Sequence, residues 1–163
     1  MEFLSRALIK PEKLISIKPE DTVEQAVSMI REHGIRMLPV LEDGKMVGIF
    51  SLKSIIREVI PKGLTAAENE SGLPDLSYID GIVDTLSEKL LDIEKLHVRD
   101  IMRTEFVKIV EDASATHVLR QIYNHGSPLP VFTKTGEFMG LITEQSMIKY
   151  LHLSYWSEEA KEQ

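Results

Sequence analysis

The sequence has 163 residues, a net charge of −7 and 43% hydrophobic residues. This apolar content is enough to bury a core, and the length fits one compact domain or two small halves. The acidic balance argues against a nucleic-acid interface, which needs a basic face. The absence of cysteine excludes disulfides, thiolate nucleophiles and cysteine-based metal sites.

A set of short motifs occurs twice in the same order. His33-Gly34 is matched by His125-Gly126, and the segment 48–54 is matched by 140–146. A duplicated unit can pair with its copy about a pseudo-twofold axis, and the surface between the copies then offers two related clefts. The duplication therefore indicates a binding module before it indicates an enzyme.

Repeat 1 is predicted to contain a strand at 14–17, a helix from 22 to 33, a hairpin at 38–50 and a second helix from 51. Thr22 and Gln25 form a capping box at the start of the first helix, and Gly34 ends it. An Asp-Gly turn at 43–44 closes the hairpin. Ser51 caps the second helix, whose expected buried stripe consists of Leu52, Ile55, Ile56 and Val59.

Repeat 2 has the same predicted order, with a strand at 106–110, a helix from Ser114 to Gly126, strands at 129–132 and 138–142, and a helix capped by Thr143. Between the repeats we expect a mobile loop at 61–74 and a connecting helix at about 78–91. The tail carries Tyr155 and Trp156, which we interpret as packing or dimer-contact residues. The predicted domains are repeat 1 at 1–60, the connector at 61–97, repeat 2 at 98–152 and a charged tail at 153–163.

The two series of elements, together with Leu38-Pro39-Val40, Leu129-Pro130-Val131 and the Val-Arg-Asp-Ile-Met segment at 98–102, resemble the CBS-domain pair, also called a Bateman module. The resemblance implies an α/β (α+β) fold of two tandem β-α-β-β-α repeats packed with pseudo-twofold symmetry. It implies a non-catalytic regulatory module with no required cofactor. Its ligand would be AMP, ADP, ATP, S-adenosylmethionine or a cyclic dinucleotide, bound in the clefts between the repeats. The resemblance also implies a homodimer, which would act on a regulated partner protein.

The resemblance places ligand contacts at the start of the last helix of each repeat, where the family has a hydroxyl and, three residues later, an aspartate. The hydroxyls are present as Ser51 and Thr143, although a plain N-cap explains them equally well. Ser54 and Ser146 stand where the family has the aspartate. Serine offers a ribose diol one neutral partner, whereas a carboxylate accepts from both hydroxyls. This departure favours a ligand without a free ribose diol, or a ligand-free dimeric scaffold as the alternative function.

Further ligand-binding candidates come from the first strands, from the residues around each Leu-Pro pair and from the end of the second hairpin. Arg36 suits a phosphate, although a solvated surface arginine is the commoner role. Repeat 2 has Pro128 at this place and no basic residue, so we expect the two clefts to differ. The first-strand residues either present backbone groups to an adenine edge or only fill the core. This set comprises Ser16, Ile17, Arg36, Met37, Pro39, Thr104, Phe106, Val107, Pro128, Pro130 and Ile142.

The sequence offers no constellation for catalysis or metal binding. His33 and His125 suit the negative ends of their helices and have no second ligand at helical spacing. There is no Walker A loop, no Gly-x-Gly-x-x-Gly and no Ser–His–Asp set in a supporting motif context, which counts against a small hydrolase. Neither a signal peptide nor an apolar run near the roughly 18 residues of a membrane span is present. We therefore expect a cytoplasmic protein that is not an enzyme and has no nucleic-acid or membrane partner.

Overall fold

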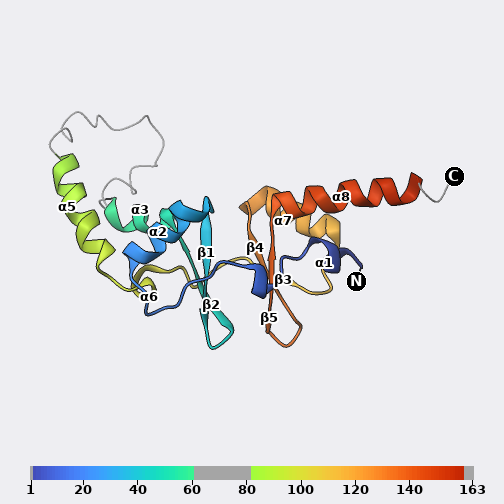
Figure 1. Cartoon of the computed structure of the whole chain (residues 1–163), viewed down its shortest axis with the longest axis horizontal. Helices are drawn as coiled ribbons and strands as arrows, with labels where there is room; N and C mark the ends of the chain where they lie inside the picture. Colours follow the sequence, from blue (N-terminus) through green and yellow to red (C-terminus); the bar gives the residue numbers. More distant parts are fainter. Residues whose placement is uncertain (1, 61–81, 160–163) are drawn as a thin grey trace, which may run out of the picture. The chain divides into compact units, whose positions relative to one another are not determined.

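The computed structural model describes residues 2–60 and 82–159, which fall into two compact units (Figure 1). Unit 1 is built from the described residues of 1–15, 43–45 and 105–163, and unit 2 from those of 16–42 and 46–104. Each unit combines a small sheet with helices, so the predicted α+β class is confirmed. The units do not follow the boundaries of the sequence repeats, because the beginning of the chain belongs to the unit that contains most of repeat 2.

Unit 2 contains α2 (Val23–His33), β1 (Met37–Glu42), β2 (Lys45–Ser51), α3 (Leu52–Val59), α5 (Ile82–Glu94) and α6 (Val98–Ile101). The predicted capping box at the start of α2 is confirmed: Gln25 N–H donates to Thr22 Oγ1 at 3.2 Å, and Thr22 N–H donates to Gln25 Oε1 at 2.9 Å. Gly34 ends the helix at a φ of 61°, a left-handed value that glycine adopts without strain. Val23, Ala26 and Ile30 carry the buried face of this helix.

Two local predictions for repeat 1 are wrong in extent. The strand expected at 14–17 is reduced to a single parallel bridge, in which Ile17 exchanges hydrogen bonds with the backbone of Pro39 and Leu41. On α3, Leu52 and Ile56 are 44% and 53% exposed, although both belong to the expected buried stripe. The core takes only a narrow face of this short helix, the one that carries Ile55.

Unit 1 contains α1 (Glu2–Ala7), the 3₁₀ turn η1 (Pro11–Lys13), β3 (Ile109–Val110), α7 (Ala115–His125), β4 (Leu129–Phe132), β5 (Phe138–Ile142) and α8 (Glu144–Glu159). Its sheet has the order β3-β4-β5, with β3 parallel and β5 antiparallel to β4. The strand predicted at 106–110 is shorter than expected, because only its last two residues pair with β4. Helix α8 continues to Glu159, past the end predicted for repeat 2.

Helix α1 packs against α8, although the two helices come from opposite ends of the described chain (Figure 1). Leu4 and Ala7 are buried in the same core as Met147 of α8. The ring of Phe3 meets the ring of Tyr150 edge to face, with centroids 5.0 Å apart. Burial of these apolar side chains fixes the first helix to the last one.

The segment that follows α1 pairs with β5 through an antiparallel bridge. Ile9 N–H donates to Leu141 O at 2.8 Å, and Leu141 N–H donates to Ile9 O at 3.0 Å. Gly140 permits this approach, because a Cβ at its position would lie 2.2 Å from the Ile9 carbonyl oxygen. The bridge holds residues 8–13 beside the start of α8.

Unit 2 contains an equivalent antiparallel backbone bridge after α6. Arg103 N–H donates to Ile49 O and Ile49 N–H donates to Arg103 O, both at 2.9 Å. A Cβ on Gly48 would lie 2.7 Å from Met102 Sδ, so this glycine also allows a close approach. The bridge brings Arg103 to the start of α3.

Part of the predicted connector lies outside the described residues, including the loop at 61–74 and the expected beginning of the connecting helix. The described part of that helix is α5, which ends three residues later than predicted, at Glu94. The side chain of Trp156 also lies outside the described set. Within residues 2–60 and 82–159, no helix combines the length and apolar character that a bilayer crossing requires.

Two candidate ligand pockets

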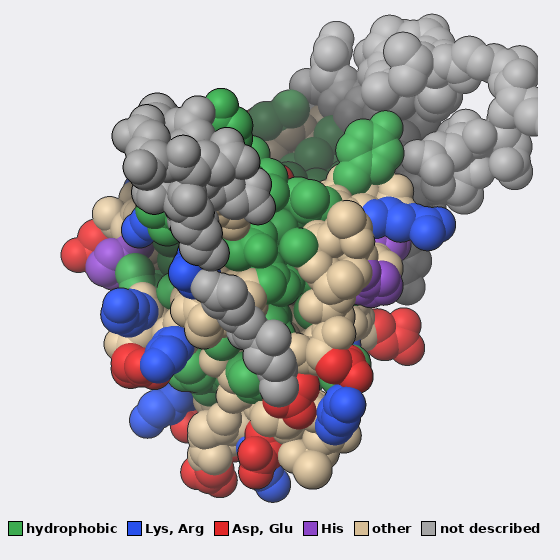
Figure 2. Space-filling model, turned by 90° about the vertical axis from the view of Figure 1, so that its right-hand side faces the viewer, with side chains coloured by type: hydrophobic (Ala, Val, Ile, Leu, Met, Phe, Trp, Pro, Cys, Tyr) green, Lys and Arg blue, Asp and Glu red, His purple; other side chains and the backbone are tan. Residues whose placement is uncertain are grey.

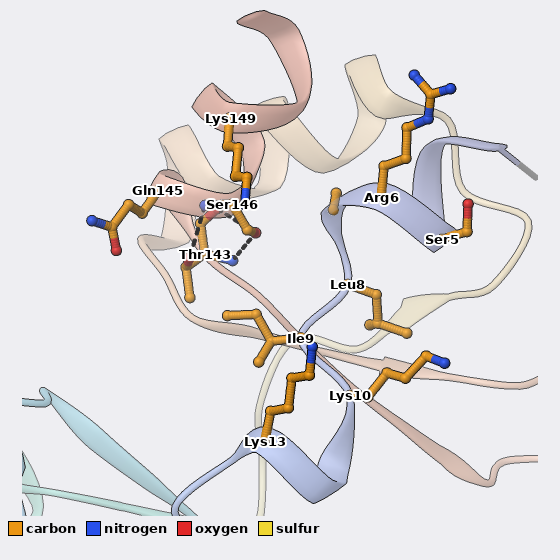
Figure 3. A pocket seen from close by; sticks show the side chains of 11 residues that line it. Ser5, Arg6, Leu8, Ile9, Lys10, Lys13, Thr143, Gln145, Ser146 and Lys149 are labelled. Atoms are coloured by element: carbon orange, nitrogen blue, oxygen red, sulfur yellow. Dashed lines mark hydrogen bonds between the residues drawn. The ribbon is translucent and has the colours of Figure 1, made fainter. Parts of the chain in front are cut away.

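The larger pocket lies at the start of α8 and encloses about 560 Å³ (Figure 3). We call it the α8 pocket. This volume is within the range of about 300–1,000 Å³ that is usual for small-molecule sites. One wall of the pocket is formed by α8. The opposite wall is formed by the segment after α1, whose close approach to β5 is permitted by Gly140. The lining residues are Ser5, Arg6, Ala7, Leu8, Ile9, Lys10, Lys13, Thr143, Gln145, Ser146 and Lys149.

Thr143 and Ser146 hydrogen bond reciprocally at the floor of the α8 pocket (Figure 3). Thr143 N–H donates to Ser146 Oγ at 3.0 Å, and Ser146 N–H donates to Thr143 Oγ1 at 3.1 Å. The Ser146 hydroxyl donates in turn to the Thr143 carbonyl at 3.1 Å. Both hydroxyls therefore cap the helix. Because a hydroxyl has one proton and two lone pairs, Ser146 retains a single lone pair and no proton for a ligand.

The charged side chains in the described lining of the α8 pocket are all basic. Its lining contains Lys10, Lys13, Lys149 and Arg6, and among the described residues no carboxylate belongs to it. The nearby carboxylate of Glu144 accepts a hydrogen bond from the Ser127 hydroxyl. The amino end of α8 adds a partial positive charge to that of the side chains. This pocket is therefore suited to an anion.

The second pocket lies at the start of α3 and encloses about 250 Å³. We call it the α3 pocket. Ser51 N–H donates to Ser54 Oγ at 3.4 Å, and the Ser54 side chain is buried. Arg57 Nη2 donates to the Ile101 carbonyl at 3.4 Å, so this cation is partly engaged within the protein. The lining residues are Ser51, Lys53, Ser54, Ile56, Arg57, Ile60 and Arg103.

The two pockets occupy equivalent positions in the two repeats. Ser51 corresponds to Thr143 and Ser54 to Ser146, while a basic residue follows six positions after each first hydroxyl, as Arg57 and as Lys149. The structure thus brings the predicted hydroxyl residues of each repeat together. The sequence analysis missed the basic positions, although their recurrence in both repeats was a readable signal.

The other predicted ligand-binding residues stay predictions, since neither pocket lining includes them among the described residues. Ile17, Pro39, Pro130 and Ile142 are buried, which favours core packing as the role of their side chains. The Phe106 ring stacks on Phe132, with centroids 6.3 Å apart. Arg36 and Thr104 are exposed, while Ser16, Met37, Val107 and Pro128 are half-buried.

Residues 5–10 and 13 were not predicted as part of a site. They reach the α8 pocket through α1 packing and the bridge between Ile9 and Leu141, which are long-range contacts. No local pattern marks such a contact, because backbone groups of any residue can form it.

The model of the CBS domain matches residues 8–61 and 98–153. These segments make up more than half of the chain, so the chain belongs to the CBS-domain family. Solved CBS-pair proteins share its fold, which confirms two tandem CBS repeats.

Inosine-5′-monophosphate dehydrogenase of Korarchaeum cryptofilum is 27% identical over 135 residues, which cover 82% of this chain and 21% of that enzyme. The chain spans less than half the length of the first curated relatives it matches. A structure of CBSX2 in complex with AMP has a TM-score of 0.64 at 16% identity, over 91% of this chain and 95% of that one; CBSX2 is from Arabidopsis thaliana. CbpB in complex with c-di-AMP also has a TM-score of 0.64, at 18% identity, over 96% of this chain and 89% of that one. At such identities these likenesses show the fold.

Proposed function

We propose that the chain is a non-catalytic regulatory module that binds an adenine nucleotide or a related ligand in the α8 pocket. The observation that carries the proposal is a pocket of about 560 Å³ with a cationic lining at the start of the last CBS helix. Two proteins of the same fold support it, because CBSX2 binds AMP and CbpB binds c-di-AMP. The cysteine-free sequence suits a reducing compartment, and we place the protein in the cytoplasm.

Ligand binding regulates only if it favours one arrangement of the protein over another. The α8 pocket has a wall built from residues 5–10 and 13, which α1 and one backbone bridge hold in place. A ligand that contacts both this wall and α8 binds best when the two are together. We propose that it stabilises the packing of α1 on α8, and that a partner protein detects this change.

The thermal unfolding of the purified protein in the presence of AMP, ADP, ATP, S-adenosylmethionine and c-di-AMP tests this function. A ligand present at 100 times its dissociation constant stabilises the fold by about 2.7 kcal/mol. For a protein of this size, the midpoint should rise by about 5–10 °C. Product analysis of the same mixtures tests for turnover, and its detection would contradict the non-catalytic assignment.

The second candidate function is a ligand-free scaffold. The Ser54 and Ser146 hydroxyls both accept hydrogen bonds from the start of their own helix, which favours a structural role. The small volume of the α3 pocket also favours this reading for repeat 1. An unchanged unfolding midpoint with every ligand, at concentrations well above micromolar, would support the scaffold and refute the sensor.

We also propose that the protein forms a homodimer through α8. Ile148 and Leu151, which lie one turn apart on the same face of this helix, are 53% and 41% exposed. Figure 2 shows apolar side chains gathered on the face viewed from the side of α8, with charged side chains along its lower edge. Burial of this apolar surface against a second copy would remove it from water. Light scattering should give twice the chain mass, and Ile148→Glu should give the monomer; a monomeric parent protein refutes the dimer.

A further inference from the structure

The cations of the α8 pocket come from both of its walls. Lys149 follows Thr143 by six residues, which is about 9 Å along the helix axis. Lys13 comes from the opposite wall, at the end of η1. Figure 3 shows the Lys149 side chain running toward Ser146 and the Lys13 side chain rising toward Ile9. Positive side chains therefore line two opposite walls of the pocket, an arrangement that an anion with several phosphate groups can contact on both sides.

The ammonium groups of this pocket are available to a ligand. Within the described part of the chain, Lys10, Lys13 and Lys149 form no ion pair with a carboxylate. Lysine donates up to three hydrogen bonds and acts as a point charge toward phosphate oxygens. In the α3 pocket, one of the cations, Arg57, donates to the Ile101 carbonyl.

The described lining of the α8 pocket lacks the charged acceptor that binds a ribose diol most strongly. A diol donates two hydrogen bonds, and a carboxylate is the side chain that accepts both. The described lining contains no carboxylate, and the Ser146 hydroxyl is already bound to Thr143 through its proton and one lone pair. Among the described residues, the pocket thus offers several cations to an anion but no carboxylate to a ribose diol.

We propose that the α8 pocket binds its ligand through a polyphosphate chain held between Lys13 and Lys149, and that the ribose hydroxyls contribute nothing to affinity. The inference rests on the proposed function in taking the ligand to be a nucleotide. It narrows the ligand class to polyphosphate compounds such as nucleoside triphosphates. The same chemistry fits inorganic polyphosphate, and the experiment separates the two sources.

Calorimetric titration of the full chain compares ATP, 2′,3′-dideoxy-ATP, AMP, adenosine and inorganic tripolyphosphate. The dissociation constants of ATP and its dideoxy analogue should agree within about threefold, because the described lining has no carboxylate to accept hydrogen bonds from the diol. Tripolyphosphate should bind on its own. AMP and adenosine should each bind at least about tenfold more weakly than ATP, since each charge-assisted hydrogen bond is worth about tenfold or more.

Three lysine variants locate the site. Lys13→Gln and Lys149→Gln should each lower the affinity for ATP about tenfold or more. Lys95→Gln is the matched control, because Lys95 is an exposed surface lysine outside both pocket linings. It should change the affinity by less than about twofold. Circular dichroism of the free variants confirms that they are folded, so a loss of binding reports on the site.

The outcomes separate the two proposals. If ATP binds but its affinity falls tenfold without the ribose hydroxyls, or if AMP equals ATP, the polyphosphate inference fails and the nucleotide sensor stands. If tripolyphosphate binds as tightly as ATP and no nucleotide exceeds it, the polyphosphate site stands and the nucleotide sensor fails. If ATP binding is unaffected by Lys13→Gln and Lys149→Gln, the inference is overturned. If no compound binds, both proposals are overturned.

Discussion

Gly140→Ala tests the backbone contact on which the α8 pocket depends. Gly140 has a φ of 140°, and a Cβ there would lie 2.2 Å from the Ile9 carbonyl oxygen and 3.2 Å from Leu8 Cδ1. The backbone conformation alone costs an alanine about 1–3 kcal/mol. Relief of the collision requires Ile9 to move away from Leu141, which breaks two hydrogen bonds worth about 0.5–1.5 kcal/mol each.

The expected total loss is about 2–6 kcal/mol of unfolding free energy, large against the 5–15 kcal/mol that is usual for a domain. Urea denaturation measures it, and an unchanged slope would show that the change lies in stability and not in compactness. Hydrogen exchange adds a local readout: the amides of Ile9 and Leu141 should exchange faster. Ligand affinity at the α8 pocket should fall as well, because residues 8–10 form its wall.

Gly136→Ala is the matched control. Gly136 also has a positive φ, of 90°, but nothing lies within 4 Å of the Cβ position. Only the conformational cost of about 1–2 kcal/mol should appear. If Gly140→Ala loses no more stability than Gly136→Ala and leaves the exchange of the Ile9 amide unchanged, then Ile9 does not pair with Leu141 and the account of the pocket wall is wrong.

Three further predictions concern unit 1. Leu4→Ala should lower the unfolding free energy by about 2–5 kcal/mol in urea, since Leu4 is only 5% exposed in the core; a loss below about 1 kcal/mol would show that α1 is not docked. Ser146→Ala should cost about 0.5–1.5 kcal/mol in the same assay by removing the acceptor for Thr143 N–H, and an unchanged midpoint would contradict the cap. The Lys134 ammonium hydrogen bonds to Asp112 at 2.9 Å and attracts its charge, which lowers the pKa of this carboxyl below its usual value. The stabilisation from Asp112 is therefore present above the unfolded pKa of about 3.9 and lost as the pH falls through the lower folded pKa; carbon-detected NMR titration should show the depressed pKa, and Lys134→Gln should return it toward the usual value.

Local features of the fold were predictable because short-range interactions determine them. The Thr22–Gln25 capping box is a pair of hydrogen bonds between neighbours in sequence, and the residue types that form it are restricted. Gly34 ends α2 because its left-handed conformation strongly favours glycine. The same local logic placed Ser51 and Thr143 at helix starts. The duplication of these signals identified the family.

The extent of burial was less predictable. Leu52 and Ile56 have the spacing of a buried stripe, yet both are exposed, because spacing specifies a face of the helix and not what covers it. The first strands are also shorter than their apolar runs suggest. How many residues of such a run pair depends on the position of the neighbouring strand, which the run itself does not encode.

The sequence by itself determined the repeats, the helix starts and the hydroxyl residues at both candidate pockets, since each is a matter of residue type and short spacing. Only the tertiary structure decided that residues 5–10 and 13 form the wall opposite Thr143, and that Arg103 approaches Ser51. These approaches depend on the docking of α1 and on backbone pairing across long stretches of chain. Backbone hydrogen bonds are available to nearly every residue, so Lys10 and Lys13 carry no sequence signal that assigns them to a pocket.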